Sequence, residues 1–402
     1  MDRGWQQDVP VWVEQTLATS GRWEVVSFLL TAHLLARSDY EAWRLGEYET
    51  LDAAMAGRDL QEVAAMVLSA LQDVDARPLT ATAHRWYGWG ACEGRHLRLF
   101  ADAELEQRCL YCWSPQQDRA QLDLFMDAPR LVLLNRLRQA MVERSAQCEV
   151  LFDRAAAEIG DDASVARLEM IYAAMAQREI ADPLVWLAYL QQTIVPAIHD
   201  EFPHCAADLL APLWRRSAES LAERPFDPAH PQHHCSALWL QAEAYDAALE
   251  AVAAVPQWWR YAALHLCRIA VFQAQHDQQQ VRAAWSLFCW VQPDAAGSAL
   301  ESADLHASGL ARLWTMAGQL ELPVEDMPAL LLLHDSLQAL SDLEAMVAGD
   351  AALADVVGDG WQHYQMLRAL LQSEATGACD VDARAALKAP APALFRAFMA
   401  TR

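Results

Sequence analysis

Glycine, asparagine and lysine are scarce in this chain of 402 residues. It has 15 glycines, fewer than its 16 tryptophans, and Asn135 and Lys388 are its sole asparagine and lysine. Glycine and asparagine supply the positive φ angles that many turns require, so their scarcity excludes a large number of elaborate loops. Catalytic and ligand-positioning residues are disproportionately found on loops. The composition therefore predicts a nearly all-helical chain and favours a binding role over catalysis.

Runs of basic residues are also missing. The chain has 54 acidic and 30 basic residues, which gives a formal net charge of −24 at pH 7. Nucleic acids and anionic membrane surfaces attract proteins through clustered lysines and arginines. We therefore expect neither nucleic acid nor a membrane as a partner.

No cysteine framework or long apolar run is evident. The 9 cysteines are scattered, and Cys267 and Cys289 lie in apolar helical stripes, where a thiol behaves as a small buried hydrophobe. The amino terminus does not have the pattern of a signal peptide. The apolar run at residues 25–36 is short of the roughly 20 residues that a transmembrane helix needs, so we expect a buried helix there. These features predict a cytoplasmic location.

Helix starts are easy to recognise in this sequence. Capping boxes pair a short polar residue with Glu or Gln three residues later: Ser38 with Glu41, Asp59 with Glu62, Asp277 with Gln280, Ser298 with Glu301, and Ser341 with Glu344. Asp182 followed by Pro183 predicts another start. Breaks are expected at Gly57–Arg58, Gly160–Asp161 and Gly297–Ser298. Apolar residues between the starts recur every three or four positions, which predicts about twenty helices stacked as antiparallel hairpins.

The chain divides into three predicted stretches. An N-terminal helical region covers 1–116 and closes with two aromatic segments, and a middle helical region covers 117–223. Three prolines then fall within residues 224–236, which excludes a continuous helix there. A C-terminal helical region covers 237–402.

The C-terminal region begins with a segment that resembles a tetratricopeptide (TPR) hairpin. In residues 236–256, Tyr245, Ala248 and Val252 match the positions of that family's second-helix Tyr, small Ala and larger apolar residue. The next hairpin, 261–295, has Ala284 as the small residue and Pro293 as the stop. The resemblance covers about 60 residues, without a persistent 34-residue period. It implies a TPR-like α-solenoid whose concave surface binds peptides or partner proteins.

Two other segments resemble parts of uncharacterised bacterial helical proteins. They are Asp39 to Glu47 and Gln121 to Met141. No activity is attached to that resemblance, so it adds no chemistry.

Histidine and cysteine clusters are the candidate metal or redox sites. His230, His233, His234 and Cys235 lie together in the proline-rich break, but a second ligand pair at zinc-site spacing is missing. The alternative is a polar linker whose side chains cap helix ends. Cys109 and Cys112 have Cys-x-x-Cys spacing without the βαβ context of a redox site, so packing on one helix face is favoured. We therefore assign no metal and no cofactor.

The carboxylates and tryptophans are the features that an all-α enzyme would use. Asp161–Asp162 does not continue into the terpene synthase pattern, and Asp123 with Asp127 is a carboxylate pair one helical turn apart. An (α/α)-toroid glycoside hydrolase would use paired carboxylates on long loops, which this sequence does not offer. The tryptophans within helical patterns are expected in the core: Trp43, Trp186, Trp239, Trp285 and Trp314.

The remaining aromatics lie beside glycine or charge and are the candidate partner-binding residues. They are Arg85, Trp86, Tyr87 and Trp89 in one segment, and Trp258, Trp259 and Arg260 in another. Trp, Tyr and Arg are the residues enriched at interface hot spots. The alternative for both segments is packing between helices. The sequence thus predicts a non-catalytic scaffold or adaptor that binds another protein or peptide, and an all-α enzyme of unrecognised class is the alternative.

Overall fold

The fold is described from a computed structural model of the chain. It covers residues 5–55, 57–115, 129–177, 179–275, 277–302, 310–334, 341–375 and 381–400. Helix accounts for 71% of the structure and there is little sheet, so the all-α prediction is confirmed. Within the described ranges, no helix has the length and apolarity needed to cross a membrane.

The chain forms two compact units. Unit 1 comprises Met1–Leu221 and Gln241–Ala244, and unit 2 comprises Ala222–Leu240 and Tyr245–Arg402. The predicted break at residues 224–236 thus lies near the division. The predicted boundary at residue 116 lies outside the described residues.

Unit 1 begins with helices and two small two-stranded sheets. The elements are α1 (Trp5–Ser20), α2 (Val25–Thr31), α3 (Arg37–Arg44), α4 (Leu51–Ala54), α5 (Leu60–Asp75), β1 (Leu79–Ala83), β2 (Trp86–Tyr87), η1 (Gly90–Cys92), β3 (His96–Leu97), α6 (Ala103–Cys109) and β4 (Tyr111–Pro115). Their buried side chains form one core that includes Trp23, Trp43 and Phe28. The apolar run at 25–36 begins as the buried helix α2, as predicted, but α2 ends at Thr31 before His33, which has a φ of 54°.

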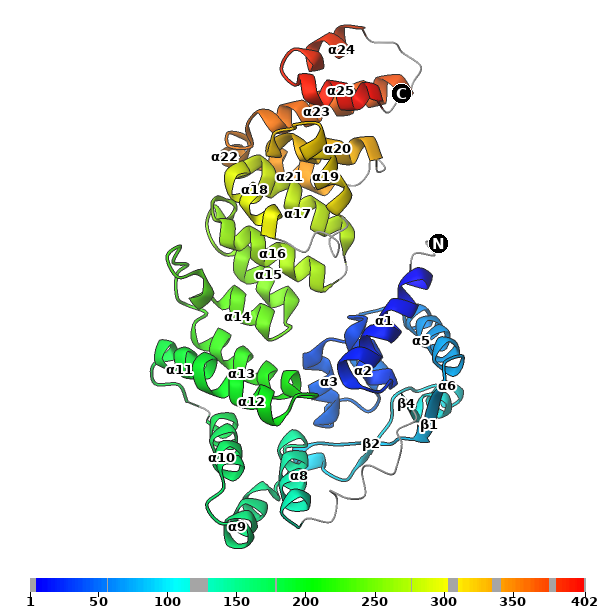
Figure 1. The fold of residues 1–402 in the computed structure, drawn as a ribbon, viewed down its shortest axis with the longest axis vertical. Helices are drawn as coiled ribbons and strands as arrows, with labels where there is room; N and C mark the ends of the chain where they lie inside the picture. The colour runs from blue at the N-terminus through cyan, green and yellow to red at the C-terminus, as the bar shows by residue number, and fades with distance from the viewer. Residues whose placement is uncertain are drawn as a thin grey trace. The chain divides into compact units, whose positions relative to one another are not determined.

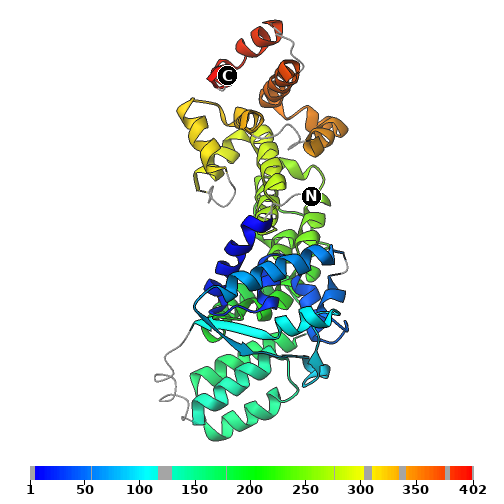
Figure 2. The ribbon, with the colours of Figure 1, turned by 90° about the vertical axis from the view of Figure 1, so that its right-hand side faces the viewer.

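The strands were not predicted. β1 pairs antiparallel with β4, with Leu79 opposite Pro115 and Ala83 opposite Tyr111, and β2 pairs antiparallel with β3. Trp23 extends the first pairing, because its backbone exchanges hydrogen bonds of 2.7 and 2.8 Å with that of Trp113. Figure 2 shows β1 and β4 in blue to cyan beside the helices of unit 1. Both aromatic segments that were expected to close a helical region therefore contain strands.

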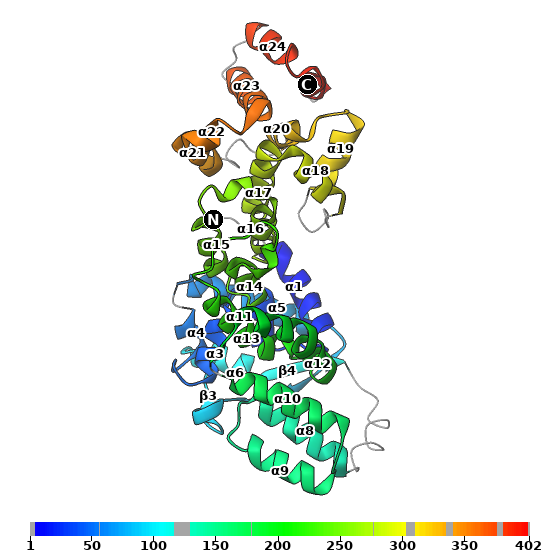
Figure 3. The same cartoon turned by 90° about the vertical axis from the view of Figure 1, so that its left-hand side faces the viewer.

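A second group of helices completes unit 1. It consists of α8 (Pro129–Val142), α9 (Cys148–Glu158), α10 (Ala163–Ala176), α11 (Pro183–Tyr189), the π-helical turn η3 (Leu190–Ile194), α12 (Val195–Glu201) and α13 (Ala206–Ser220). α8 packs against α9 and α10, and α12 packs against α10 and α13. In Figure 3, α8, α9 and α10 lie side by side.

Unit 2 contains helices and no strand among its described residues. Its elements are η4 (Pro231–His233), α14 (Cys235–Gln241), α15 (Tyr245–Ala253), η5 (Trp258–Arg260), α16 (Ala262–Ala274), α17 (Gln278–Val291), α18 (Pro293–Ser302), α19 (Ala311–Gln319), η6 (Val324–Asp326), α20 (Met327–His334), α21 (Ser341–Gly349), α22 (Ala351–Ala354), α23 (Gly358–Ala375), α24 (Val381–Lys388) and α25 (Pro392–Ala400).

Neighbouring helices of unit 2 pack in chain order at first and then around one central helix. α15 packs against α16, and α16 against α17 (Figure 1). α17 also contacts α18, α20 and α23, so its surroundings include helices far along the chain. Trp285, Phe288 and Trp290 of α17 are each at most 2% exposed and anchor the core of the unit.

Three of the predicted helix starts are confirmed by their hydrogen bonds. Asp59 accepts from the backbone of Gln61 and Glu62, Asp182 caps α11, and Asp277 caps α17. α21 begins at Ser341 itself.

Two predicted helix starts are wrong. Ser38 lies inside α3, because the extended residue Ala36 begins that helix earlier. Ser298 lies inside α18, because Pro293 opens it, so the break predicted at Gly297–Ser298 is also wrong. A Cβ on Gly297 would lie 3.2 Å from the Val324 side chain, so this glycine serves close packing rather than a turn.

Candidate functional site

The first predicted binding segment is divided by burial. Arg85 and Tyr87 are exposed, whereas Trp86 is 5% and Trp89 is 1% exposed. The difference between Trp86 and Tyr87 arises because successive strand residues face opposite sides, and β2 turns Trp86 toward the core. Trp86 and Trp89 were expected to present their rings to a partner, but both rings lie in the core.

Backbone contacts fix Trp89 in place. Its N–H donates to the Arg44 carbonyl at 2.6 Å, and the N–H of Gly90 donates to the Glu143 carbonyl at 3.1 Å. Before it, Gly88 packs so closely that a Cβ would lie 2.3 Å from the Cys92 carbonyl oxygen. The loop that carries Trp89 thus requires a glycine and is held by α3 and by the end of α8.

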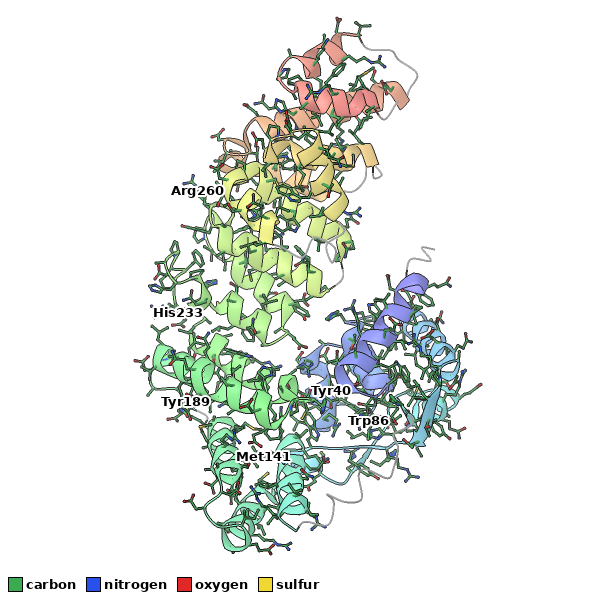
Figure 4. The ribbon with its side chains drawn as sticks, viewed as in Figure 1. Tyr40, Trp86, Met141, Tyr189, His233 and Arg260 are labelled. Carbon is green, nitrogen blue, oxygen red and sulfur yellow. The ribbon has the colours of Figure 1, made fainter. Side chains whose placement is uncertain are left out.

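Two arginines lie over the ring of Trp89. The Cζ atoms of Arg44 and Arg144 are 4.4 and 5.1 Å from the ring centroid, and Tyr40 meets the ring edge-on at 5.5 Å. Cations so placed are attracted to the electron-rich face of the indole. Tyr40 and Trp86 are labelled in Figure 4 in this part of unit 1. We call the following residues the Trp89 cluster: Tyr40, Glu41, Arg44, Trp89, Arg144 and Arg215.

Glu41 links the remaining arginines of the cluster. It is 4% exposed, and its Oε2 lies 3.2 Å from Nη1 of Arg215 and 3.4 Å from Nη2 of Arg144. Arg144 has a left-handed backbone, with a φ of 52°, at the turn that follows α8. Residues distant in sequence, on α3, after α8 and on α13, therefore meet around one carboxylate.

A second buried ion pair lies on the same helix α3. Arg37 contacts Asp208, and its Nε lies 2.8 Å from Oε2 of Glu243. Burial raises the pKa of Asp208, and the positive charge of Arg37 opposes that shift. Arg37 thus places one positive charge between the carboxylates of Asp208 and Glu243.

The second predicted binding segment is also divided by burial. Gln257, with a φ of 51°, turns the chain so that Trp259 is 3% exposed while Trp258 is half-buried and Arg260 is exposed. Trp259 donates from Nε1 to Oδ2 of Asp350 at 3.4 Å. The expectation of an exposed ring is thus corrected for Trp259, whose indole belongs to the core.

Arginines also stack on both of these tryptophans. The Cζ of Arg260 lies 5.1 Å from the Trp259 ring, and that of Arg268 lies 4.4 Å from the Trp258 ring. Burial lowers the pKa of Arg268. Among the described residues, no carboxylate lies within ion-pair distance of Arg260 or Arg268. We call Trp258, Trp259, Arg260 and Arg268 the arginine–tryptophan surface; Figure 4 labels Arg260.

His265 supports this surface from below. It is 1% exposed and packs beside Trp258, and its Nε2–H donates to the Trp259 carbonyl at 2.7 Å. Burial lowers the pKa of His265 to about 4. The neutral imidazole thus holds the turn that carries both tryptophans.

We expect acid to destabilise unit 2 through His265. The unfolded chain takes up a proton near pH 6.5, whereas the folded protein resists it down to about pH 4, so stability is lost as the pH falls through this interval. In the wild type, this histidine should lower the free energy of unfolding by about 3 kcal/mol over the interval. The His265→Gln variant should not show this contribution. Hydrogen exchange of α16 peptides across the pH range measures it, after correction for intrinsic exchange rates. An equal pH dependence in both proteins would contradict this assignment.

The histidines that were candidate metal ligands bond to neighbouring residues rather than facing a common point. His230 bonds to Asp227 at 3.0 Å and stacks on His233, and His234 bonds to the hydroxyl of Ser236 at 2.8 Å. Within the described part of the chain, no three His, Cys, Asp or Glu side chains converge as metal ligands would. The histidines instead bond within the linker and at the start of α14.

The Cys-x-x-Cys pair does not lie on one helix face as predicted. Cys109 ends α6, whereas Cys112 lies in β4, because the pairing of β4 with β1 ends the helix. Both thiols are buried, and burial raises their pKa values, that of Cys109 to about 12. Such thiols are poor nucleophiles.

The tryptophans expected in the core divide by burial. Trp43, Trp186 and Trp285 are buried, as predicted, and Trp239 and Trp314 are half-buried. Asp162 caps α10. Asp123 and Asp127 lie outside the described residues.

Comparison with protein-family models, curated proteins and solved structures finds no match. The chemistry of these two arginine and tryptophan sites is therefore the basis for a function.

The arginines that complete both sites were not predicted from the sequence. Arg268 interrupts the apolar stretch 262–272, and a lone charge among buried positions could have marked it. Arg37, Glu41 and Arg44 are spaced by four and three residues, which places them on one face of α3. Nothing in the sequence indicates that Arg144 and Arg215 join them.

Proposed function

We propose that this chain is a non-catalytic binding protein that docks an acidic segment of a partner protein on the arginine–tryptophan surface of unit 2. The observation that carries the proposal is that Arg260 and Arg268 are held over tryptophan rings with no carboxylate partner among the described residues. These two arginines, held in place by the rings, can each pair with a carboxylate of a partner.

The local charge supports an acidic partner. The chain as a whole has a net charge of −24, yet residues 255–292 contain Arg260, Arg268 and Arg282 against the single acidic residue Asp277. From outside this stretch, the carboxylate of Asp350 approaches the surface, where it accepts from Nε1 of Trp259. Guanidinium groups are weakly hydrated and pair with carboxylates through two parallel hydrogen bonds. A stacked arginine also loses less conformational entropy on binding than a free one. This stretch is therefore suited to a negatively charged peptide.

The packing of the first helices of unit 2 supports a TPR-like scaffold as part of the proposal. α15, α16 and α17 contact one another in chain order, and Ala248, Val252 and Ala284 are buried at the positions that the resemblance assigns to packing. Stacked hairpins present extended surfaces for partners. A cytoplasmic location also belongs to the proposal, because the cysteines of the described residues are free thiols.

The test uses immobilised peptides of equal length and increasing Asp and Glu content. Binding of the full chain should rise with acidic content and fall with added salt. The double variant Arg260→Gln/Arg268→Gln should bind at least tenfold more weakly, since arginines at the centre of an interface are typical hot spots. Its circular dichroism spectrum should match that of the wild type.

Arg396→Gln is the matched control, because it removes one exposed positive charge from α25 of the same unit. It should bind the peptides as the wild type does. Binding that ignores acidic content, or that survives in the double variant, would refute the proposal.

A further inference from the structure

The Trp89 cluster in unit 1 contains buried N–H groups that have no acceptor. They are Nε of Arg44, Nη2 of Arg144, Nη2 of Arg215 and Nε1 of Trp89, none of which has a hydrogen-bond partner. Nη2 of Arg144 is near Glu41 but misaligned for a hydrogen bond. Buried donors in folded proteins are almost always paired, because an unpaired one is costly. Four such donors in one cluster indicate a missing acceptor.

The cluster also has an excess of positive charge. Arg144 and Arg215 share the carboxylate of Glu41, and among the described residues no carboxylate lies within ion-pair distance of Arg44. The charge of Asp208 also acts on Arg44, but Asp208 is already paired with Arg37. Three guanidinium groups thus share the carboxylate of Glu41. A water molecule could accept hydrogen bonds here but would leave this charge unbalanced, whereas an anion would do both.

The donors approach from three separate elements. Arg44 ends α3, Arg144 follows α8, and Arg215 lies in α13. The side chains of Arg144 and Arg215 are 26% and 25% exposed, so the outer parts of both groups reach solvent while their Nη2 atoms are buried. A tetrahedral oxyanion can accept from donors on several elements at once, whereas a planar carboxylate pairs best with the two parallel donors of a single guanidinium.

The cluster also contains one buried acceptor without a hydrogen-bond partner. Oε1 of Glu41 is buried and has no hydrogen-bond partner. An anion that fills the cluster must therefore accept several hydrogen bonds and also donate one. Hydrogen phosphate retains one P–O–H group at neutral pH, whereas sulfate and an ionised phosphate monoester have no such donor.

We propose that the Trp89 cluster is a binding site for inorganic phosphate. Three phosphate oxygens would accept from Arg44, Arg144, Arg215 and Trp89, and the P–O–H group would donate to Oε1 of Glu41. The site lies in unit 1 and is independent of the peptide-binding surface proposed for unit 2.

Isothermal titration of the full chain with sodium phosphate tests the proposal, with sodium chloride at equal ionic strength as the reference. We expect saturable binding of phosphate and at least tenfold weaker binding of sulfate, because sulfate lacks the hydrogen bond to Glu41. Phosphate that gives no more heat than chloride, or sulfate that binds equally well, would overturn the proposal.

Three variants separate binding from folding. Arg144→Asn keeps a residue that tolerates the left-handed backbone and should weaken phosphate binding about tenfold. Glu41→Gln supplies an amide that can donate, so it should narrow the preference for phosphate over sulfate. Arg154→Gln, which removes a surface arginine on α9, should bind phosphate as the wild type does. Phosphate affinity that is unchanged in Arg144→Asn would refute the site even if Glu41→Gln failed to fold.

Discussion

Replacing Arg37 with methionine should lower the free energy of unfolding by about 3–5 kcal/mol. The Arg37 side chain is 11% exposed and bonds to both Asp208 and Glu243. Methionine would fill much of the space of the arginine but would leave two carboxylates without a counterion. Urea denaturation followed by circular dichroism measures the loss.

The pH dependence identifies the cause of that loss. Burial already raises the pKa of Asp208 above its ordinary value, and removal of Arg37 should raise it further. A carboxyl group with a raised pKa in the folded state makes unfolding easier as the pH rises through the interval between the two pKa values. The gap between Arg37→Met and the wild type should therefore narrow as the pH falls from neutral toward about 4.

Arg37→Lys is the matched control for this prediction. It keeps the charge and loses the forked hydrogen bonds, so its stability should lie between those of the wild type and Arg37→Met. A loss below about 1 kcal/mol in Arg37→Met would contradict the role of this ion pair.

Replacing Trp290 with alanine should lower the stability of unit 2 by about 3–5 kcal/mol. The ring is 2% exposed and packs edge-on against Trp361 at 4.9 Å and Tyr364 at 5.1 Å. Truncation to alanine would remove buried apolar area and would also leave a cavity between α17 and α23. Hydrogen exchange should accelerate in peptides of α17 and α23, with no change in peptides of α1 and α5. Equal acceleration in both units would contradict the description of separate cores.

Trp290→Phe is the control. The indole Nε1 of Trp290 is buried without a hydrogen-bond partner, so phenylalanine removes an unpaired donor together with part of the ring. We expect a loss of about 1 kcal/mol, and a loss as large as that of Trp290→Ala would show that the cavity is not the main cause.

The helical content was predictable because its signals are local. Caps such as Asp59 and Asp182 act within three residues of a helix start, and the structure confirms them. The strands were not predictable in the same way. β1 depends on its pairing with β4, roughly thirty residues away, and on the backbone of Trp23, and no short window contains those partners.

The candidate sites were only partly predictable for a related reason. Trp89 and Trp258 were predicted as site residues from their aromatic segments, and the structure places arginines on both rings. Burial of Trp89 follows from the loop that joins it to α3 and α8, which is a tertiary contact. Glu41 and Arg215 are separated by 174 residues, and their ion pair has no signature in a single sequence.

The short stretch Gln241–Ala244 limits how this protein can be divided. It belongs to unit 1, whereas the residues on both sides of it belong to unit 2. A fragment that ends at Leu221 would lose the buried Ala242 and the carboxylate of Glu243 that bonds to Arg37. Proteolysis that cuts the chain once near residue 222 should therefore give two pieces, neither of which contains a complete set of native contacts. Separate expression of unit 1 requires residues 241–244 to be joined back to it.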